Sequence, residues 1–352
     1  MKKLEAAIKK IEPINTRLLE QTQKKLDNLT KPRGSLGRLE ELAKQVVCIT
    51  GMEEPKIKNK VIITMAGDHG VVKEGISAYP QEVTPQMVYN FLRGGAGINV
   101  LARHVGARIK VVDIGVAAGL DPNPELINKK IARGTKNMAN GPAMTREEAI
   151  KSIEAGIEVV EEELKAGIDI IGTGDMGIGN TTPSSAIAAV ITGEEVVRVT
   201  GRGTGIDDNK FKNKVKVIEA ALQVNNPNPK DGIDVLAKVG GFEIGGIAGV
   251  IIASAANHIP IMIDGFISGA AALIAVKLEP KIKDYLIASH CSVEIGHRII
   301  LEYMGLKPLF DFNLRLGEGT GAALGISIVE AGVKILTEMA TFESAGVSEA
   351  IT

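Results

Sequence analysis

The chain has 352 residues, of which 45% are hydrophobic and 24% charged, so it is long enough for a large core and a smaller subdomain and is neither disordered nor fibrous. Its 41 basic and 42 acidic side chains nearly cancel, which gives no reason to expect nucleic acid or a membrane surface as a partner. Two cysteines without CxxC spacing predict neither a disulfide framework nor a zinc site, and a reducing cytoplasm fits.

The first part of the chain has the apolar spacing of amphipathic helices. Residues 4–29 show this pattern with a break near Pro13, and residues 36–49 continue it after the turn KPRGSLG. The opening MKKLEAAIKKIEP is charged and lacks a continuous apolar core, so we do not expect a signal peptide.

Short segments rich in Val and Ile follow, and each ends in polar or small residues. They predict strands at residues 60–70, 108–115, 168–175, 259–265, 285–290 and, more weakly, 309–312. The apolar stretch 245–278 is interrupted by Asn257, Pro260 and Asp264, which indicates a buried strand and helices rather than a membrane span.

Helix-length segments separate several of these strands. In residues 145–166, Thr145 and Glu148 form a capping box and Gly167 stands at the C-terminal cap. In TPQMVYNFL we expect Thr84 to be the N-cap and Pro85 the first helical residue. Continuous apolar strands alternating with helices predict a parallel α/β sheet covered on both faces, with a ligand site at the polar strand ends.

Three kinds of site compete at these strand ends. GTGDMG (172–177) matches a dinucleotide-binding pattern, but Pro183 stands where the phosphate-binding helix should be under way. VVDIGVAAG (111–119) has one acid and no Thr-rich loop, which disfavours a transferase that uses an activated pyrophosphate sugar. GTGDMGIGNTT and TGRGTGIDD offer backbone N–H groups, Thr181 and Thr182 hydroxyls and nearby Lys214, a combination that suits a phosphomonoester.

Histidines give no metal pattern. His69 in AGDHG has no second histidine three or four residues away, so a structural hydrogen bond is the better interpretation. His290 and His297 stand seven residues apart without a carboxylate in ligand register. We therefore expect no metal.

Longer motifs are more specific than any of these patterns. KPRGSLGRLE (31–40), MAGDHGVVKEGISAYPQEVTPQMVYNFLRGGAGINVLA (65–102), GTGDMGIGNTTPSSAIAA (172–189), TGRGTGIDD (200–208), DGFISGAAAL (264–273), SHCSVEIGH (289–297) and RLGEGTGAALG (315–325) follow in order along nearly the whole chain. Together they resemble the nicotinate-nucleotide:dimethylbenzimidazole phosphoribosyltransferase family.

The resemblance implies a reaction of cobalamin lower-ligand biosynthesis, in which the ribose 5-phosphate of nicotinate mononucleotide moves to a benzimidazole nitrogen. Nicotinate and α-ribazole 5′-phosphate are the implied products, and no cofactor is implied. The implied fold is a three-layer α/β/α sandwich with a parallel Rossmann-like sheet and a small helical domain. We place the small domain at residues 1–55 with 330–352 and the large domain at residues 56–329. A cytoplasmic homodimer is also implied.

The resemblance further implies roles for individual residues. Glu318 of RLGEGTG would be the general base that takes the benzimidazole N–H proton, with inversion at C1 of the ribose. The helix expected at residues 322–336 would help to keep Glu318 ionised. Asp264 of IDGF is a second acidic candidate, and so is Asp175, which stands where the family usually has Glu. The phosphate cradle would be Met176, Gly177, Gly203, Lys214 and Ser292, and the benzimidazole pocket Tyr79, Gln86 and Leu316.

Other functions stay open on sequence alone. An NAD-dependent oxidoreductase would depend on the turn at residues 172–177, and a nonenzymatic binding module would not need Glu318. A related transferase that uses adenine or a phenol as acceptor differs only in pocket shape, and one or two methyl contacts are worth only about 1–3 kcal/mol.

Overall fold

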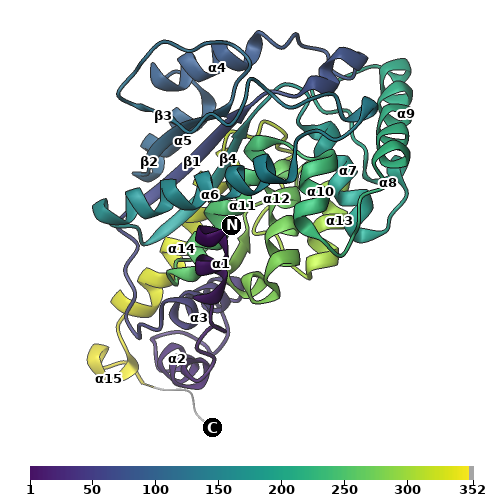
Figure 1. Cartoon of the computed structure of the whole chain (residues 1–352). Helices are drawn as coiled ribbons and strands as arrows, with labels where there is room; N and C mark the ends of the chain where they lie inside the picture. The colour runs from purple at the N-terminus through teal and green to yellow at the C-terminus, as the bar shows by residue number, and fades with distance from the viewer. Residues whose placement is uncertain (349–352) are drawn as a thin grey trace.

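A computed structural model describes residues 1–348 and has a six-stranded sheet at its centre (Figure 1). All strand pairs are parallel, and the order is β3-β2-β1-β4-β5-β6. This order reverses between β1 and β4, as in a Rossmann sheet, and confirms the predicted fold class. The strands are β1 (Lys60–Gly67), β2 (Arg108–Gly115), β3 (Leu126–Asn128), β4 (Ile170–Met176), β5 (Ile261–Ile263) and β6 (Leu286–Ala288).

Five of the six predicted strands are present, and the weakest prediction is wrong. Residues 309–312 form no strand, and only a single parallel bridge joins Phe310 to His290. The edge strand β3 was not predicted, because its three residues are only partly buried or exposed and carry no continuous apolar run.

One face of the sheet is covered by α4 (Val83–Leu92), α5 (Gly97–Val105) and α14 (Thr320–Glu338), with α3 (Arg38–Thr50) packed against α14. By length and composition alone, α14 could cross a membrane, but 56% of its most apolar 18-residue window is buried inside the protein. Its apolar residues Ala322, Ile326 and Val329 belong to the core cluster on this face of the sheet. We therefore interpret α14 as a core helix.

The opposite face is covered by α11 (Phe242–Ala256) and α12 (Phe266–Leu278). Every residue of α11 is buried, because α6 (Arg146–Glu163) and other helices form a further layer outside (Figure 1). These helices and β5 account for the apolar stretch 245–278, as predicted. The remaining helices on this side are α7 (Thr181–Thr192), α8 (Val196–Val199), α9 (Asp208–Asn225), α10 (Gly232–Val239) and α13 (Ile295–Met304), and 3₁₀ turns cover Gly70–Glu74, Met138–Asn140, Leu164–Ala166 and Pro280–Tyr285.

One of the two predicted helix starts is correct. The Thr145 hydroxyl accepts from the Glu148 N–H, and the Glu148 carboxylate accepts from the Thr145 N–H, which confirms the capping box of α6. Thr84 is not the N-cap of α4, because the helix starts one residue earlier, at Val83. The buried Thr84 hydroxyl instead accepts from the Ile178 N–H at 3.1 Å, so it joins α4 to the segment after β4.

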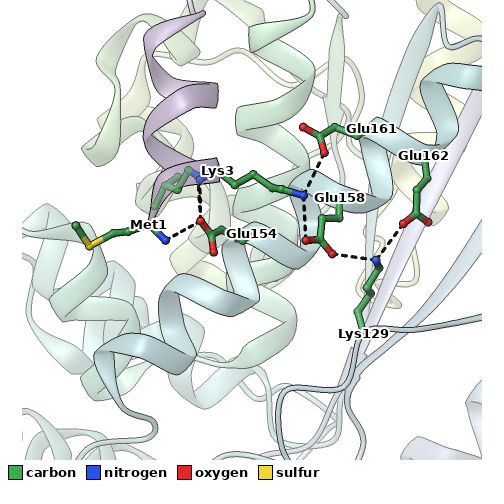
Figure 2. Close-up of polar contacts among 8 residues, drawn as sticks. Met1, Lys3, Lys129, Glu154, Glu158, Glu161 and Glu162 are labelled. Atoms are coloured by element: carbon green, nitrogen blue, oxygen red, sulfur yellow. Dashed lines mark hydrogen bonds and ion pairs between the residues drawn. The ribbon is translucent and has the colours of Figure 1, made fainter.

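The terminal segments meet at one end of the molecule. Helices α2 (Leu18–Asp27), α3 and α14 share a small apolar cluster, and Leu29 pairs with Thr341 just before α15 (Phe342–Ala345). Helix α1 (Lys2–Lys9) packs on α6 and α11 instead. Its Lys3 and also Lys129 each lie within 3.0 Å of the Glu158 carboxylate, and Figure 2 draws both contacts. The division into residues 1–55 with 330–352 and 56–329 stays our proposal.

We expect Gly156→Ala to destabilise the protein by about 2–3 kcal/mol. A Cβ at this position of α6 would lie 2.0 Å from the Gly246 carbonyl oxygen on α11, and backbone cannot move aside cheaply. The measurement is the free energy of unfolding in urea. Gly119→Ala is the matched control, since a Cβ there meets no atom within 4 Å. Equal stability of the two variants would contradict this account of the α6–α11 contact.

Candidate active site

A cavity of about 320 Å³ lies at the carboxyl ends of the strands. The loops after β1, β4, β5 and β6 all contribute to it, so it includes the point between β1 and β4 where the strand order reverses. Open α/β sheets bind their ligands at this place. The walls come from residues 76–79, 175–181, 203–204, 265–267, 290–294 and 315–317.

The loop that carries Glu318 has a left-handed backbone at three consecutive residues. The φ angles are +80° at Gly317, +65° at Glu318 and +100° at Gly319. A glutamate in this region is strained by about 1–3 kcal/mol, and such strain is often found at functional sites. The Thr64 hydroxyl donates to the Glu318 carbonyl oxygen at 2.9 Å, which holds the loop against the sheet.

The Glu318 side chain is 4% exposed and points to the start of α5. Its Oε2 accepts from the Ile98 N–H at 3.0 Å. Among residues 1–348 no donor is found for Oε1. Glu318 itself does not line the cavity, but the preceding residues Leu316 and Gly317 do. Burial raises the pKa of Glu318, and the Ile98 N–H opposes that rise. The N–H group that favours the ionised form of Glu318 therefore belongs to α5, and not to α14 as predicted.

The N-terminus of α14 binds a different carboxylate, that of Asp264. Asp264 Oδ1 accepts from the Ala322 N–H at 2.9 Å, and Oδ2 from the Gly319 N–H at 3.2 Å. Although these bonds favour the ionised form, complete burial raises the pKa of Asp264 to about 7. Asp264 therefore holds the Glu318 loop through the Gly319 N–H and does not itself line the cavity.

Asp175 is the last residue but one of β4, and it does line the cavity. The Asn180 amide donates to its Oδ2 at 2.8 Å, while the buried Oδ1 has no hydrogen-bond partner within residues 1–348. Burial and the neighbouring Asp264 raise the pKa of Asp175 well above its ordinary value. Asp175 thus lies in the cavity wall, and two further carboxyl groups with raised pKa values, Asp264 and Glu318, lie near it behind that wall.

A buried cation lies behind the part of the cavity wall that Thr181 and Gly203 form. Lys214 of α9 is 1% exposed, and its Nζ donates to the Thr181 hydroxyl at 2.7 Å and the Gly201 carbonyl at 3.2 Å. Burial lowers the pKa of Lys214 to about 8, and the Glu294 carboxylate opposes this shift. No carboxylate in residues 1–348 pairs with Nζ within 4.0 Å. A buried lysine without a counterion suits an anionic ligand at Thr181 and Gly203.

The structure brings most of the predicted binding residues to this cavity. Tyr79, Met176, Gly177, Gly203, Ser292 and Leu316 all line it. Gln86 does not, because it is an exposed residue of α4. Lys214 lies directly behind Thr181 and Gly203.

Two sequence patterns receive a structural explanation. GTGDMG is not a dinucleotide-binding turn between a strand and a helix, because its residues lie within or directly after β4. His69 Nε2 lies 2.9 Å from Glu243 Oε1 with both groups buried, in agreement with a structural role. Burial disfavours the imidazolium, but the Glu243 carboxylate outweighs it and raises the pKa of His69. Within residues 1–348, no three His, Cys, Asp or Glu side chains are grouped as metal ligands.

Comparison with known proteins identifies the family. A family model described as phosphoribosyltransferase matches residues 11–347. The chain belongs to the nicotinate-nucleotide–dimethylbenzimidazole phosphoribosyltransferase family. A member from Geobacter sulfurreducens is 61% identical over 98% of both chains, and one from Desulforudis audaxviator is 58% identical over 99% of this chain and 98% of its own. The crystal structure of CobT from Thermus thermophilus superposes with a TM-score of 0.92 at 43% identity, over 95% of this chain and all of that one.

Membership makes this protein a phosphoribosyltransferase, a glycosyltransferase-type enzyme. In that light the cavity contains three polar residues that the sequence reasoning did not single out. Asn180 bonds Asp175, Glu294 Oε1 accepts from the Gly203 N–H at 2.8 Å, and Arg315 lies at the cavity wall. All three stand inside the family motifs, which was the only available signal for them.

The two buried aspartates should make the protein less stable as the pH rises from about 4 to 7. Their pKa values are raised in the fold, so the folded state binds more protons than the unfolded state in this window, and stability falls with rising pH. The measurement is the free energy of unfolding at pH 5 and pH 8. Asp175→Asn and Asp264→Asn should each reduce the difference. A difference that neither variant changes would contradict the assignment.

Proposed function

We propose that this enzyme transfers the ribose 5-phosphate of nicotinate mononucleotide to 5,6-dimethylbenzimidazole, giving nicotinate and α-ribazole 5′-phosphate for the lower ligand of cobalamin. The names of its relatives support these substrates. The observation that carries the proposal is one cavity with two kinds of charged group: the buried Lys214 behind Thr181 and Gly203, which has no carboxylate within 4.0 Å among residues 1–348, and the Asp175 carboxyl group in the cavity wall. The first suits a phosphate, and the second suits a cationic ribosyl centre and an N–H acid.

Glu318 is the proposed general base. Nicotinate leaves from a cationic pyridinium, so no acid has to protonate it, and the chemical contribution of the protein is to take the N–H proton of the attacking benzimidazole. The raised pKa of Glu318 brings it closer to neutral pH, where a general base works best. Attack on the face opposite the leaving group inverts C1 from β to α. The neighbouring Asp175 would stabilise positive charge on the ribose whenever it is ionised.

We assign the phosphate of the nucleotide and the benzimidazole to different residues of the cavity. We assign the phosphate to Lys214 and the Thr181 hydroxyl, with Met176, Gly177, Gly203 and Ser292 around them. The benzimidazole is assigned to the side of Tyr79 and Leu316, where half or more of each residue is exposed and available for contact. Gln86 belongs to this assignment only if α4 moves.

The direct test uses purified protein with nicotinate mononucleotide and 5,6-dimethylbenzimidazole, with products separated by chromatography. Formation of nicotinate and α-ribazole 5′-phosphate is the expected result. Product with adenine or a phenol but not with the benzimidazole would keep the transferase class and overturn the acceptor. No product from folded protein with any acceptor would overturn the proposed function.

We further propose that the enzyme works in the cytoplasm as a homodimer. Both cysteines, Cys48 and Cys291, are buried and free. Exposed apolar side chains such as Val293, Ile295 and Phe312 lie near the cavity and would be covered by a second copy. Light scattering of the purified protein measures the mass, and a monomer at micromolar concentration would overturn the dimer.

A further inference from the structure

His290 is a buried cavity residue that the proposed chemistry does not use. It stands two residues after the end of β6, is 2% exposed and lines the cavity together with Gly265 and Ser292. Its ring stacks on Phe310 with centroids 5.9 Å apart and planes at 16°. On another side, a Cβ at Gly321 of α14 would lie 2.0 Å from Nδ1, so the glycine lets the helix pack directly on the imidazole. The ring is therefore held in one orientation.

The hydrogen bonds of Ser289 determine which ring nitrogen carries the proton. The Ser289 hydroxyl donates to the Asp264 carbonyl oxygen at 3.0 Å, and a carbonyl can only accept. The single hydroxyl proton is then used, so the contact of 3.0 Å between Ser289 Oγ and His290 Nδ1 requires Nδ1–H as the donor. A neutral ring protonated at Nδ1 has a bare lone pair at Nε2.

The ring also stays neutral at working pH. Burial lowers the pKa of His290 to about 4, and the charge of Asp311 only partly opposes this shift. Nε2 is therefore an acceptor throughout the neutral range. A Cβ at Gly265 would lie 3.6 Å from Nε2, so the absence of a side chain there leaves room on the cavity side.

Only a donor can bind such a nitrogen, and the proposed substrates have few. The phosphate and the nicotinate carboxylate accept, and the benzimidazole N–H is already assigned to Glu318. The two ribose hydroxyls remain. His290 also shares the cavity wall with Ser292, which is assigned to the phosphate, and with the Asp175 carboxyl group, so the ribose of a bound nucleotide lies in the same cavity as Nε2.

We propose that His290 Nε2 accepts a hydrogen bond from a ribose hydroxyl of the nucleotide substrate and so makes the enzyme select ribosyl over deoxyribosyl donors. Ser289 is the positioning residue that fixes the tautomer. This proposal rests on the proposed function, and it adds a sugar-recognition residue to it.

The test compares nicotinate mononucleotide with its 2′-deoxy and 3′-deoxy analogues in wild type and His290→Phe. Relative to nicotinate mononucleotide, kcat/KM on one analogue should fall roughly 5- to 20-fold more in wild type than in His290→Phe. The reason is that the phenyl ring keeps the shape of the imidazole but cannot accept a hydrogen bond. Because both proteins are compared on the same analogue, the intrinsic reactivity of that analogue does not affect the comparison. Equal discrimination by the two proteins would overturn the proposal, and an inactive wild type would overturn the proposed function instead.

Phe310→Leu is the matched control, because it disturbs packing on the same ring and leaves Nε2 in place. It should keep the wild-type discrimination, and a loss equal to that of His290→Phe would assign the effect to packing. A second measurement needs no variant to fold. In protein with ¹⁵N-labelled histidine, which has only five such residues, NMR should show His290 protonated at Nδ1. A proton on Nε2 would overturn the proposal.

Discussion

Glu318→Gln is expected to lower kcat by ~10² to 10⁴ while the protein stays folded. Glutamine has the same shape and keeps an oxygen to accept from the Ile98 N–H, but it cannot take the proton of the attacking base. The free energy of unfolding should stay the same or rise slightly, because burial already disfavours the ionised carboxylate. Steady-state release of nicotinate measures the first effect, and urea unfolding measures the second.

Two further variants make this experiment specific. Glu302→Gln introduces the same chemical change on the exposed face of α13 and should leave kcat unchanged. Glu318→Asp keeps a carboxylate one methylene further back and should retain more activity than the glutamine variant. If Glu318→Gln stays within about threefold of wild type, Glu318 is not the base, and Asp175 becomes the next residue to replace.

Much of the fold could be predicted from sequence because its strands are buried on both sides. β1 and β4 are buried along almost their whole length, and such strands show as continuous apolar runs that end in Gly, Asp or His. β3 lies at the sheet edge and shows no such run. The segment 309–312 has two phenylalanines, and they serve a different purpose, since Phe310 and Phe312 stack beside His290.

The error at Thr84 has a tertiary cause. Thr-Pro at the start of an apolar run is a good local cap signal. The Thr84 hydroxyl instead accepts from the Ile178 N–H, 94 positions along the chain, and α4 begins at Val83. Local propensity cannot report a bond to a loop so distant in sequence.

The site shows the same limit. The glycines around Glu318 could be read as a permissive backbone, and the structure has left-handed φ angles at all three residues 317–319. The direction of the side chain could not be read in this way. The loop sends the carboxylate of Glu318 to α5 and leaves the start of α14 to Asp264, and this exchange depends on how β4, β5 and two helices meet. Similarly, the burial of Lys214 behind Thr181 is a property of packing, since a lysine on a charged helix is usually solvated.

Lys214→Met is expected to raise KM for nicotinate mononucleotide by roughly 30- to 1,000-fold, because removing one partner of a buried charge pair costs about 2–4 kcal/mol. The matched substrate is nicotinate riboside, which lacks the phosphate. Wild type and variant should use the riboside with similar kcat/KM. An equal loss on both substrates would mean that Lys214 supports the fold of the cavity and does not bind the phosphate.

In the ligand-free protein, by contrast, the buried charge of Lys214 should lower the free energy of unfolding. Its pKa is about 8 in the fold and about 10.4 in the unfolded chain, so between these values the unfolded state binds more protons and wild-type stability rises with pH. This rise should be smaller in Lys214→Met, which has no charge to bury. Inorganic phosphate at pH 7 should raise the melting temperature of wild type, because it binds the folded state only, and should leave the variant unchanged. If phosphate stabilises the variant as much as it stabilises wild type, the anion binds elsewhere in the cavity.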